Sequence, residues 1–168
     1  GVSSANGVGV AVEVNSETDF VARNDVFQKM VAQIADAATE TNGDFDSVRA
    51  AKFPGTSKSI EEHIAEMVGQ IGENLSLRRS AGLSVSQGVV ASYVHGQVVD
   101  GAGKIGVLVA LKSSGDKAKL EALGKKIAMH AAAARPLSGK IEDLDPAVVQ
   151  REKDVLAEQA RSSGKPEN

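Results

Sequence analysis

The 168-residue sequence has no cysteine and no tryptophan, and its only aromatic residues are four Phe and one Tyr. Without cysteine there are no disulfides, thiolate nucleophiles or Cys-based zinc sites, which favours a cytoplasmic location. No apolar run approaches the roughly 20 residues that a membrane-spanning helix needs, so we expect no membrane partner. The net charge is −3, and nucleic-acid binding needs a clustered basic surface. We therefore expect no nucleic-acid partner.

The remaining composition is that of an ordinary globular protein, with 42% hydrophobic and 24% charged residues. A chain of this length can bury a sizeable core in one domain and still carry a small appendage. Alternating valines predict a strand over residues 8–14, and a 3.6-residue apolar period predicts a helix over 27–38. A loop is expected over 41–57, followed by a helix that begins at Ser59 with a capping box to Glu62.

The second half of the sequence predicts two more strands in a hairpin and two more helices. Residues 74–84 indicate a strand, and two β-branched runs within 88–112 flank an Asp-Gly turn. A helix is expected to turn Leu120, Leu123, Ile127 and Ala131 inward, and a last helix covers roughly 146–161. Strands joined by hairpins and mixed with helices predict an α+β fold, in which an antiparallel sheet of three or more strands packs with amphipathic helices. We expect a core domain over 1–145 and a separate helical region over 146–168.

A weak internal repeat relates residues 8–38 to residues 105–134. The strands match at an offset of 97 and the helices at an offset of 93. The connection between strand and helix is therefore longer in the first copy, and the added length includes Thr18, Asp19, Phe20 and Val21. Loops carry function more often than the elements they join. This loop is the first candidate for a functional site.

Phe20 stands beside Asp19 in an otherwise polar stretch, and two interpretations are open. In the first, the ring folds back over the core or packs under the following helix. In the second, the ring protrudes and inserts into a pocket on a partner protein, as interface aromatics do.

Features that would indicate an enzyme are missing. His63 is expected on a solvated helix face, and no second His stands at metal-binding spacing. His95 is expected on a strand surface, whereas His130 interrupts an alanine-rich helix and is a candidate for a partner contact. The sequence contains neither a nucleophile elbow nor a phosphate-binding loop, so no catalytic residue, cofactor or metal ligand is assigned.

Several segments resemble the elongation factor Ts family, in chain order and over most of the sequence. The most specific is VEVNSETDFVARND at 12–25, and IGENLSLRR at 71–79 and SYVHG at 92–96 follow it. IGVLVAL at 105–111, KKIAMHAAAARP at 125–136 and SGKP at 163–166 complete the set. The family's N-terminal helical domain and the part that follows SGKPEN have no counterpart here.

The resemblance implies a guanine-nucleotide exchange factor for the translation GTPase elongation factor Tu, acting in the cytoplasm. It places Thr18, Asp19, Phe20 and Val21 near the nucleotide and Mg²⁺ of that GTPase, and Met129 and His130 at a second contact. It also implies that 146–168 begins a truncated coiled coil, through which a homodimer could form. The alternatives left open are an enzyme that acts through His130 or His63 and an interaction scaffold without exchange activity.

Overall fold

The computed structural model describes residues 1–5 and 7–163 and has the predicted α+β fold. The chain divides into two compact units, 1–134 and 135–168. The expected division after residue 145 stays a prediction. Residues 164–166 of the SGKP segment lie outside the described residues.

The first unit contains an antiparallel sheet in the order β1-β2-β3, formed by Val2–Ala5, Val8–Asn15 and Ser76–Ser84. The valines of β2 alternate as predicted, so Val10 and Val12 enter the core. β2 is the central strand, with Val2 of β1 opposite Ala11 and Ser80 of β3 opposite Val12. The segment that follows β2 is therefore attached to the most fully hydrogen-bonded strand of this sheet.

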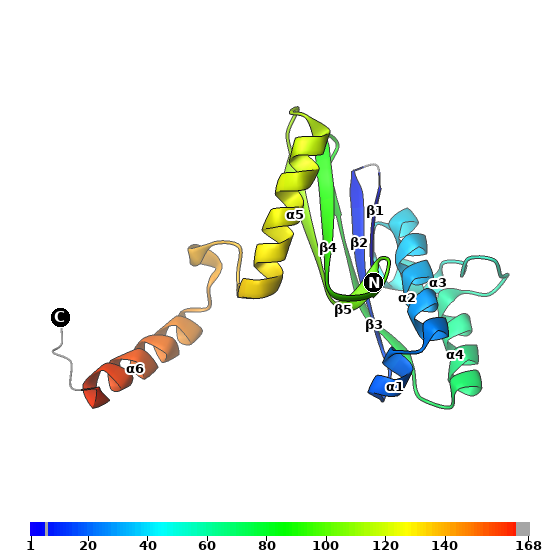
Figure 1. Ribbon diagram of the computed structural model, residues 1–168, viewed down its shortest axis with the longest axis horizontal. Helices are drawn as coiled ribbons and strands as arrows, with labels where there is room; N and C mark the ends of the chain where they lie inside the picture. Colours follow the sequence, from blue (N-terminus) through cyan, green and yellow to red (C-terminus); the bar gives the residue numbers. More distant parts are fainter. Residues whose placement is uncertain (6, 164–168) are drawn as a thin grey trace. The chain divides into compact units, whose positions relative to one another are not determined.

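Helices cover this sheet (Figure 1). α2 (Asp25–Ala38) buries the predicted apolar stripe, and α4 (Ile60–Ile71) begins with the predicted capping box between Ser59 and Glu62. The expectation of a loop over 41–57 was wrong in part, because this segment contains the end of η1 (Thr39–Thr41) and all of α3 (Phe45–Ala50). Asp44 caps α3, and Val48 of this helix is buried. The largest fully buried side chains are those of Met30, Ile34, Ile60, Val10 and Val48.

The predicted hairpin forms a second sheet, with β4 (Gly88–Val99) antiparallel to β5 (Ala102–Lys112). α5 (Lys117–Ala134) packs along it through Gly124, Ala128 and Ala132. The predicted inward stripe of α5 was wrong, because Leu123 and Ile127 are 50% and 40% exposed. The small residues face inward because they let the helix approach the strand closely. A Cβ on Gly124 would stand 2.6 Å from Ala91 Cβ.

The second unit contains η2 (Ile141–Asp143) and α6 (Pro146–Ser162), which Asp145 caps. α6 agrees closely with the predicted last helix. Val155 and Leu156 are exposed, whereas Val148 and Val149 are half-buried. A continuation into a coiled coil stays a prediction. Within residues 1–5 and 7–163, no helix is both long and apolar enough to cross a membrane.

Candidate partner-binding site

The connection between β2 and α2 contains a single helical turn, α1 (Asp19–Ala22), that presents an aromatic ring to solvent. Phe20 is 88% exposed, whereas the next residue, Val21, is buried in the core. The matching connection between β5 and α5 spans only 113–116, against 16–24 here. The sequence correctly indicated that the longer connection carries Phe20. The structure places the ring outside the core, which excludes the interpretation in which it folds back.

The N-terminal end of α1 is held by Thr18 and Glu73. Thr18 is the N-cap, and its Oγ1 accepts a hydrogen bond from the Val21 amide at 3.5 Å. The Thr18 amide donates to Glu73 Oε2 at 3.1 Å, and the Thr18 hydroxyl donates to Oε1 at 2.5 Å. Both carboxylate oxygens of Glu73 therefore bind one residue of the turn. Sequence reasoning missed Glu73, since it lies 55 positions away and nothing in the local pattern indicates the contact.

The C-terminal end of α1 is held by Gln28, a buried polar residue of α2. Gln28 Nε2 donates to the carbonyl oxygen of Ala22 at 3.0 Å. Asn24 then starts α2 directly, because its side chain accepts hydrogen bonds from the amides of Val26 and Phe27. The turn is thus fixed at both ends while Phe20 projects between them.

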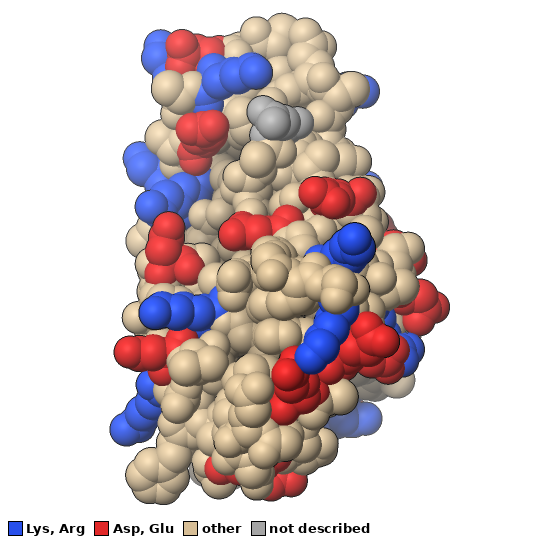
Figure 2. Space-filling view, turned by 90° about the vertical axis from the view of Figure 1, so that its right-hand side faces the viewer, with Lys and Arg blue, Asp and Glu red and all other residues tan. Residues whose placement is uncertain are grey.

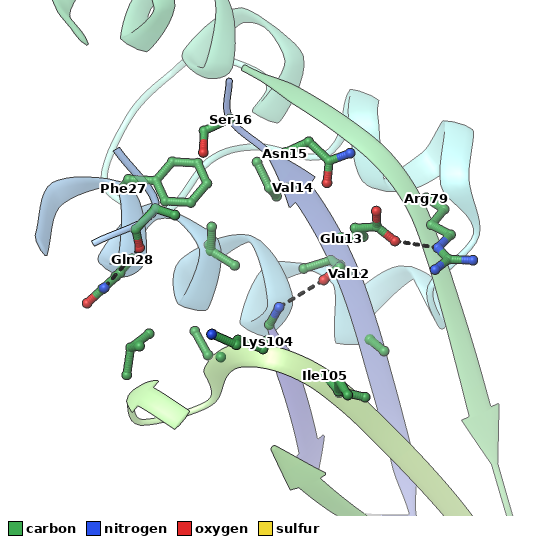
Figure 3. A pocket seen from close by; sticks show the side chains of 18 of the residues that line it. Val12, Glu13, Val14, Asn15, Ser16, Phe27, Gln28, Arg79, Lys104 and Ile105 are labelled. Atoms are coloured by element: carbon green, nitrogen blue, oxygen red, sulfur yellow. Dashed lines mark hydrogen bonds and ion pairs between the residues drawn. The ribbon is translucent and has the colours of Figure 1, made fainter. Parts of the chain in front are cut away.

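A groove of about 840 Å³ lies beside this turn, and residues 15–19 form part of its wall. Figure 3 shows Phe27 and Gln28 on one side of the groove and Glu13 paired with Arg79 on the other. Glu13 accepts hydrogen bonds from Arg78 at 3.0 Å and from Arg79 at 2.5 Å. These bonds, led by that of Arg78, lower the pKa of the Glu13 carboxyl. Glu13 therefore stays ionised at neutral pH and joins β2 to β3 next to the turn.

The second predicted contact lies on a different element. Met129 is 47% exposed and His130 is exposed, both near the C-terminal end of α5. Figure 1 shows α5 and α1 on opposite sides of the strands of the first unit. The two predicted contacts are therefore separate surfaces of the first unit and do not form one pocket.

The other histidines differ in their surroundings. His95 is exposed on β4, as expected. The expectation that His63 lies on a solvated face was wrong, because its ring stacks on Phe53 with 3.6 Å between centroids. Burial lowers the pKa of His63 against the opposing effect of Glu66, and its Nδ1 has no hydrogen-bond partner. Packing against the apolar ring of Phe53 explains the position of His63, and chemistry is not needed to do so.

The described part of the chain holds no group of three or more His, Asp or Glu side chains arranged to bind a metal ion. Acidic and basic side chains alternate over the face that Figure 2 presents, and they form no continuous basic surface there. The most distinctive feature of the site is therefore the exposed ring on a firmly held turn. Such a ring suits insertion into a protein pocket, since interface hot spots are rich in aromatic residues.

The comparisons with known proteins identify the family of the chain. The family model described as elongation factor TS matches residues 17–168. The chain is 59% identical over 165 residues, 98% of its length, to elongation factor Ts of Parvibaculum lavamentivorans. It is 56% identical over its full length to elongation factor Ts of Rhizobium leguminosarum bv. trifolii, and it spans about half (54%) of each of these two relatives. Elongation factor Ts of Rhodospirillum centenum is 54% identical over 167 residues. With the family model matching nearly the whole chain, this protein belongs to the elongation factor Ts family.

Proposed function

We propose that this chain promotes GDP release from elongation factor Tu by inserting the Asp19–Phe20 turn near the bound nucleotide and its Mg²⁺. The observation that carries the proposal is the 88% exposure of Phe20 on a turn that hydrogen bonds hold at both ends. A ring so exposed adds nothing to the core, yet the surrounding structure fixes its position. Family membership supports the GTPase as the partner.

The mechanism needs no acid, base or metal on this chain. Mg²⁺ bridges the nucleotide phosphates to the GTPase, so displacing the groups around the ion weakens nucleotide binding. A ring on a fixed turn can cause such a displacement because little conformational entropy is lost when it enters the partner. Linkage requires that GDP weaken the binding of this chain by the same factor. The activity is therefore a binding competition, and the protein is not an enzyme.

The residues of the turn have different parts in this proposal. Phe20 is the inserted group, and Asp19, exposed beside it, makes a polar contact with the partner. Thr18 keeps the turn closed, and Val21 anchors it in the core. Met129 and His130 form a second contact with the same GTPase. This second surface would align the chain so that Phe20 meets its pocket, without taking part in nucleotide release.

Two further expectations belong to the same proposal. An exchange factor for a translation GTPase acts in the cytoplasm, and a homodimer would form through the region that α6 begins. The alternative function is a scaffold that binds the GTPase and leaves its nucleotide in place. The exposed Phe20 ring suits either function, because interface aromatics also anchor a scaffold to its partner, and nucleotide release is the measurement that separates the two.

The deciding measurement is the release of labelled GDP from elongation factor Tu, with Phe20→Ala compared with the unchanged chain. We expect the variant to lose most of the stimulation, since truncating an interface aromatic can cost about 2 kcal/mol or more. Its free energy of unfolding should stay within about 0.5 kcal/mol, as for other surface changes. Leu137→Ala is a matched control, because Leu137 is also exposed and lies in the other unit.

Each result separates the two functions. Stimulated release by the unchanged chain and by Leu137→Ala, but not by Phe20→Ala, supports exchange through the ring. Binding of the GTPase with no change in GDP release would establish the scaffold instead. A large loss of stability in Phe20→Ala with release preserved would show that the ring serves the fold.

A further inference from the structure

α1 is too short to hold its own shape. It has four residues and one buried side chain, that of Val21. Isolated helices much longer than this are marginal in water, because the first turn fixes several residues for a single hydrogen bond. The conformation that presents Phe20 must therefore be stabilised from outside the turn.

Glu73 provides this stabilisation from a rigid position. It follows Gly72, the left-handed residue that ends α4, and Leu75 two positions later is buried at 4% exposure. The backbone of Glu73 is thus fixed on both sides, and its side chain is half-buried. A carboxylate that accepts two hydrogen bonds from one residue makes a stronger and more directional contact than a neutral pair does.

The carboxylate also lies at the favourable end of α1. The amides of a first helical turn have no carbonyl partner within the helix, and negative charge near them is stabilising. The Thr18 amide, which precedes this turn, is satisfied by Glu73 Oε2. The Thr18 hydroxyl donates to Oε1 and so keeps its lone pairs turned toward the Val21 amide. One carboxylate therefore orients the cap that closes the turn.

We propose that Glu73 is a positioning residue that holds the Thr18–Ala22 turn in the conformation that presents Phe20 to the partner. The inference rests on the proposed function of the turn. Glu73 does not reach into the partner; it sets the fraction of molecules in which the ring is ready to bind. The end of α4 and the Phe20 turn are then joined by the hydrogen bonds between Glu73 and Thr18, although they lie far apart in the sequence.

A positioning role has a distinct kinetic signature. The apparent affinity of a protein falls in proportion to the fraction of molecules in the competent conformation. If Glu73→Ala leaves the turn formed in about one molecule in ten, the concentration for half-maximal GDP release rises about tenfold. The maximal rate at saturation stays unchanged, because every bound molecule still inserts the ring. Phe20→Ala should instead lower the maximal rate.

The experiment measures GDP release from elongation factor Tu over a range of concentrations for Glu73→Ala, Thr18→Val and the double variant. Thr18→Val removes the hydroxyl from the other side of the contact, and it covers the case in which Glu73→Ala folds poorly. The double variant should lose less than the sum of the two single losses, because both single variants remove the bond between the Thr18 hydroxyl and Glu73. Glu73→Ala also removes the bond from the Thr18 amide, and Thr18→Val also removes the cap on the Val21 amide. Glu73→Gln should give a half-maximal concentration between those of Glu73→Ala and the unchanged chain, because its amide oxygen can accept one of the two hydrogen bonds. Glu40→Ala, which removes an exposed carboxylate on η1, is the control.

A second measurement requires no partner. The Ala22 amide donates to the carbonyl of Thr18 at 3.2 Å, and the Arg23 amide donates to that of Asp19 at 3.2 Å. Hydrogen exchange at these two amides reports whether the turn is formed in the free protein. We expect faster exchange in Glu73→Ala and Thr18→Val, with the amides of β2 unchanged.

The outcomes distinguish this inference from the function on which it rests. If the unchanged chain fails to release GDP, the proposed function fails, and amide exchange alone decides whether Glu73 holds the turn. If Phe20→Ala abolishes release while Glu73→Ala matches the unchanged chain in both measurements, the positioning role is wrong and the function stands. A lower maximal rate with an unchanged half-maximal concentration in Glu73→Ala would also overturn it, since Glu73 would then act on nucleotide release directly.

Discussion

The two strand–helix pairs of the first unit, β2–α2 and β5–α5, have the same apolar spacing but bury different faces of their helices. α2 buries Phe27, Met30 and Ile34. Their counterparts in α5 at the repeat offset, Leu120, Leu123 and Ile127, are not buried, and Gly124, Ala128 and Ala132 are. Apolar periodicity thus shows that a helix is amphipathic without showing which of two adjacent faces enters the core.

The difference follows from the distance between helix and strand. Ala91 of β4 is buried opposite Gly124, so the α5 backbone can come close enough to exclude large side chains from the interface. Close packing of small residues gains dispersion contacts in place of a larger buried apolar area. The two strand–helix pairs also differ in their connections, because the connection between β2 and α2 is long enough to form α1.

The largest expected effect comes from truncating equivalent isoleucines. Ile34 is 0% exposed and Ile127 is 40% exposed. Ile34→Ala should lower the free energy of unfolding by about 2–5 kcal/mol, because it leaves a cavity in the core. Ile127→Ala should cost less, about 1 kcal/mol, because 40% of this residue's surface is already in water and its loss leaves no closed cavity. Urea unfolding of both variants measures the contrast, and equal losses would contradict the assignment of the inward face of α5.

The next effect is a contrast between two glycines in helices. Replacement by alanine should destabilise the protein at one of them and stabilise it at the other. Gly124→Ala places a Cβ 2.6 Å from Ala91 Cβ, and overpacking of this kind costs about 1–3 kcal/mol. Better helix propensity returns roughly 1 kcal/mol, so the net loss should be up to about 2 kcal/mol. Gly69→Ala in α4 is the control, because its Cβ would meet nothing within 4 Å. It should stabilise the protein by about 0.5–1 kcal/mol. Stabilisation by both substitutions in thermal melts would show that α5 does not pack closely.

Much of the fold could be predicted because its signals are local. The alternation of Val8 to Val14, the apolar stripe of α2 and the capping box at Ser59 each depend on residues within one turn or one strand. α3 was missed because its six residues are too few for a periodic pattern, and Asp44 was not recognised as its cap. His63 was misplaced for a different reason, since the Phe53 ring that covers it lies outside its own helix.

The sequence alone established that this is an α+β chain of the elongation factor Ts family with an aromatic ring in an unusually long polar connection. These conclusions rest on residue types and their spacing, which a linear chain displays directly. The outward direction of Phe20, the inward face of α5 and the hold of Glu73 on Thr18 were settled by folding. Each depends on how closely segments distant in sequence approach one another, and that distance is a property of the packed molecule.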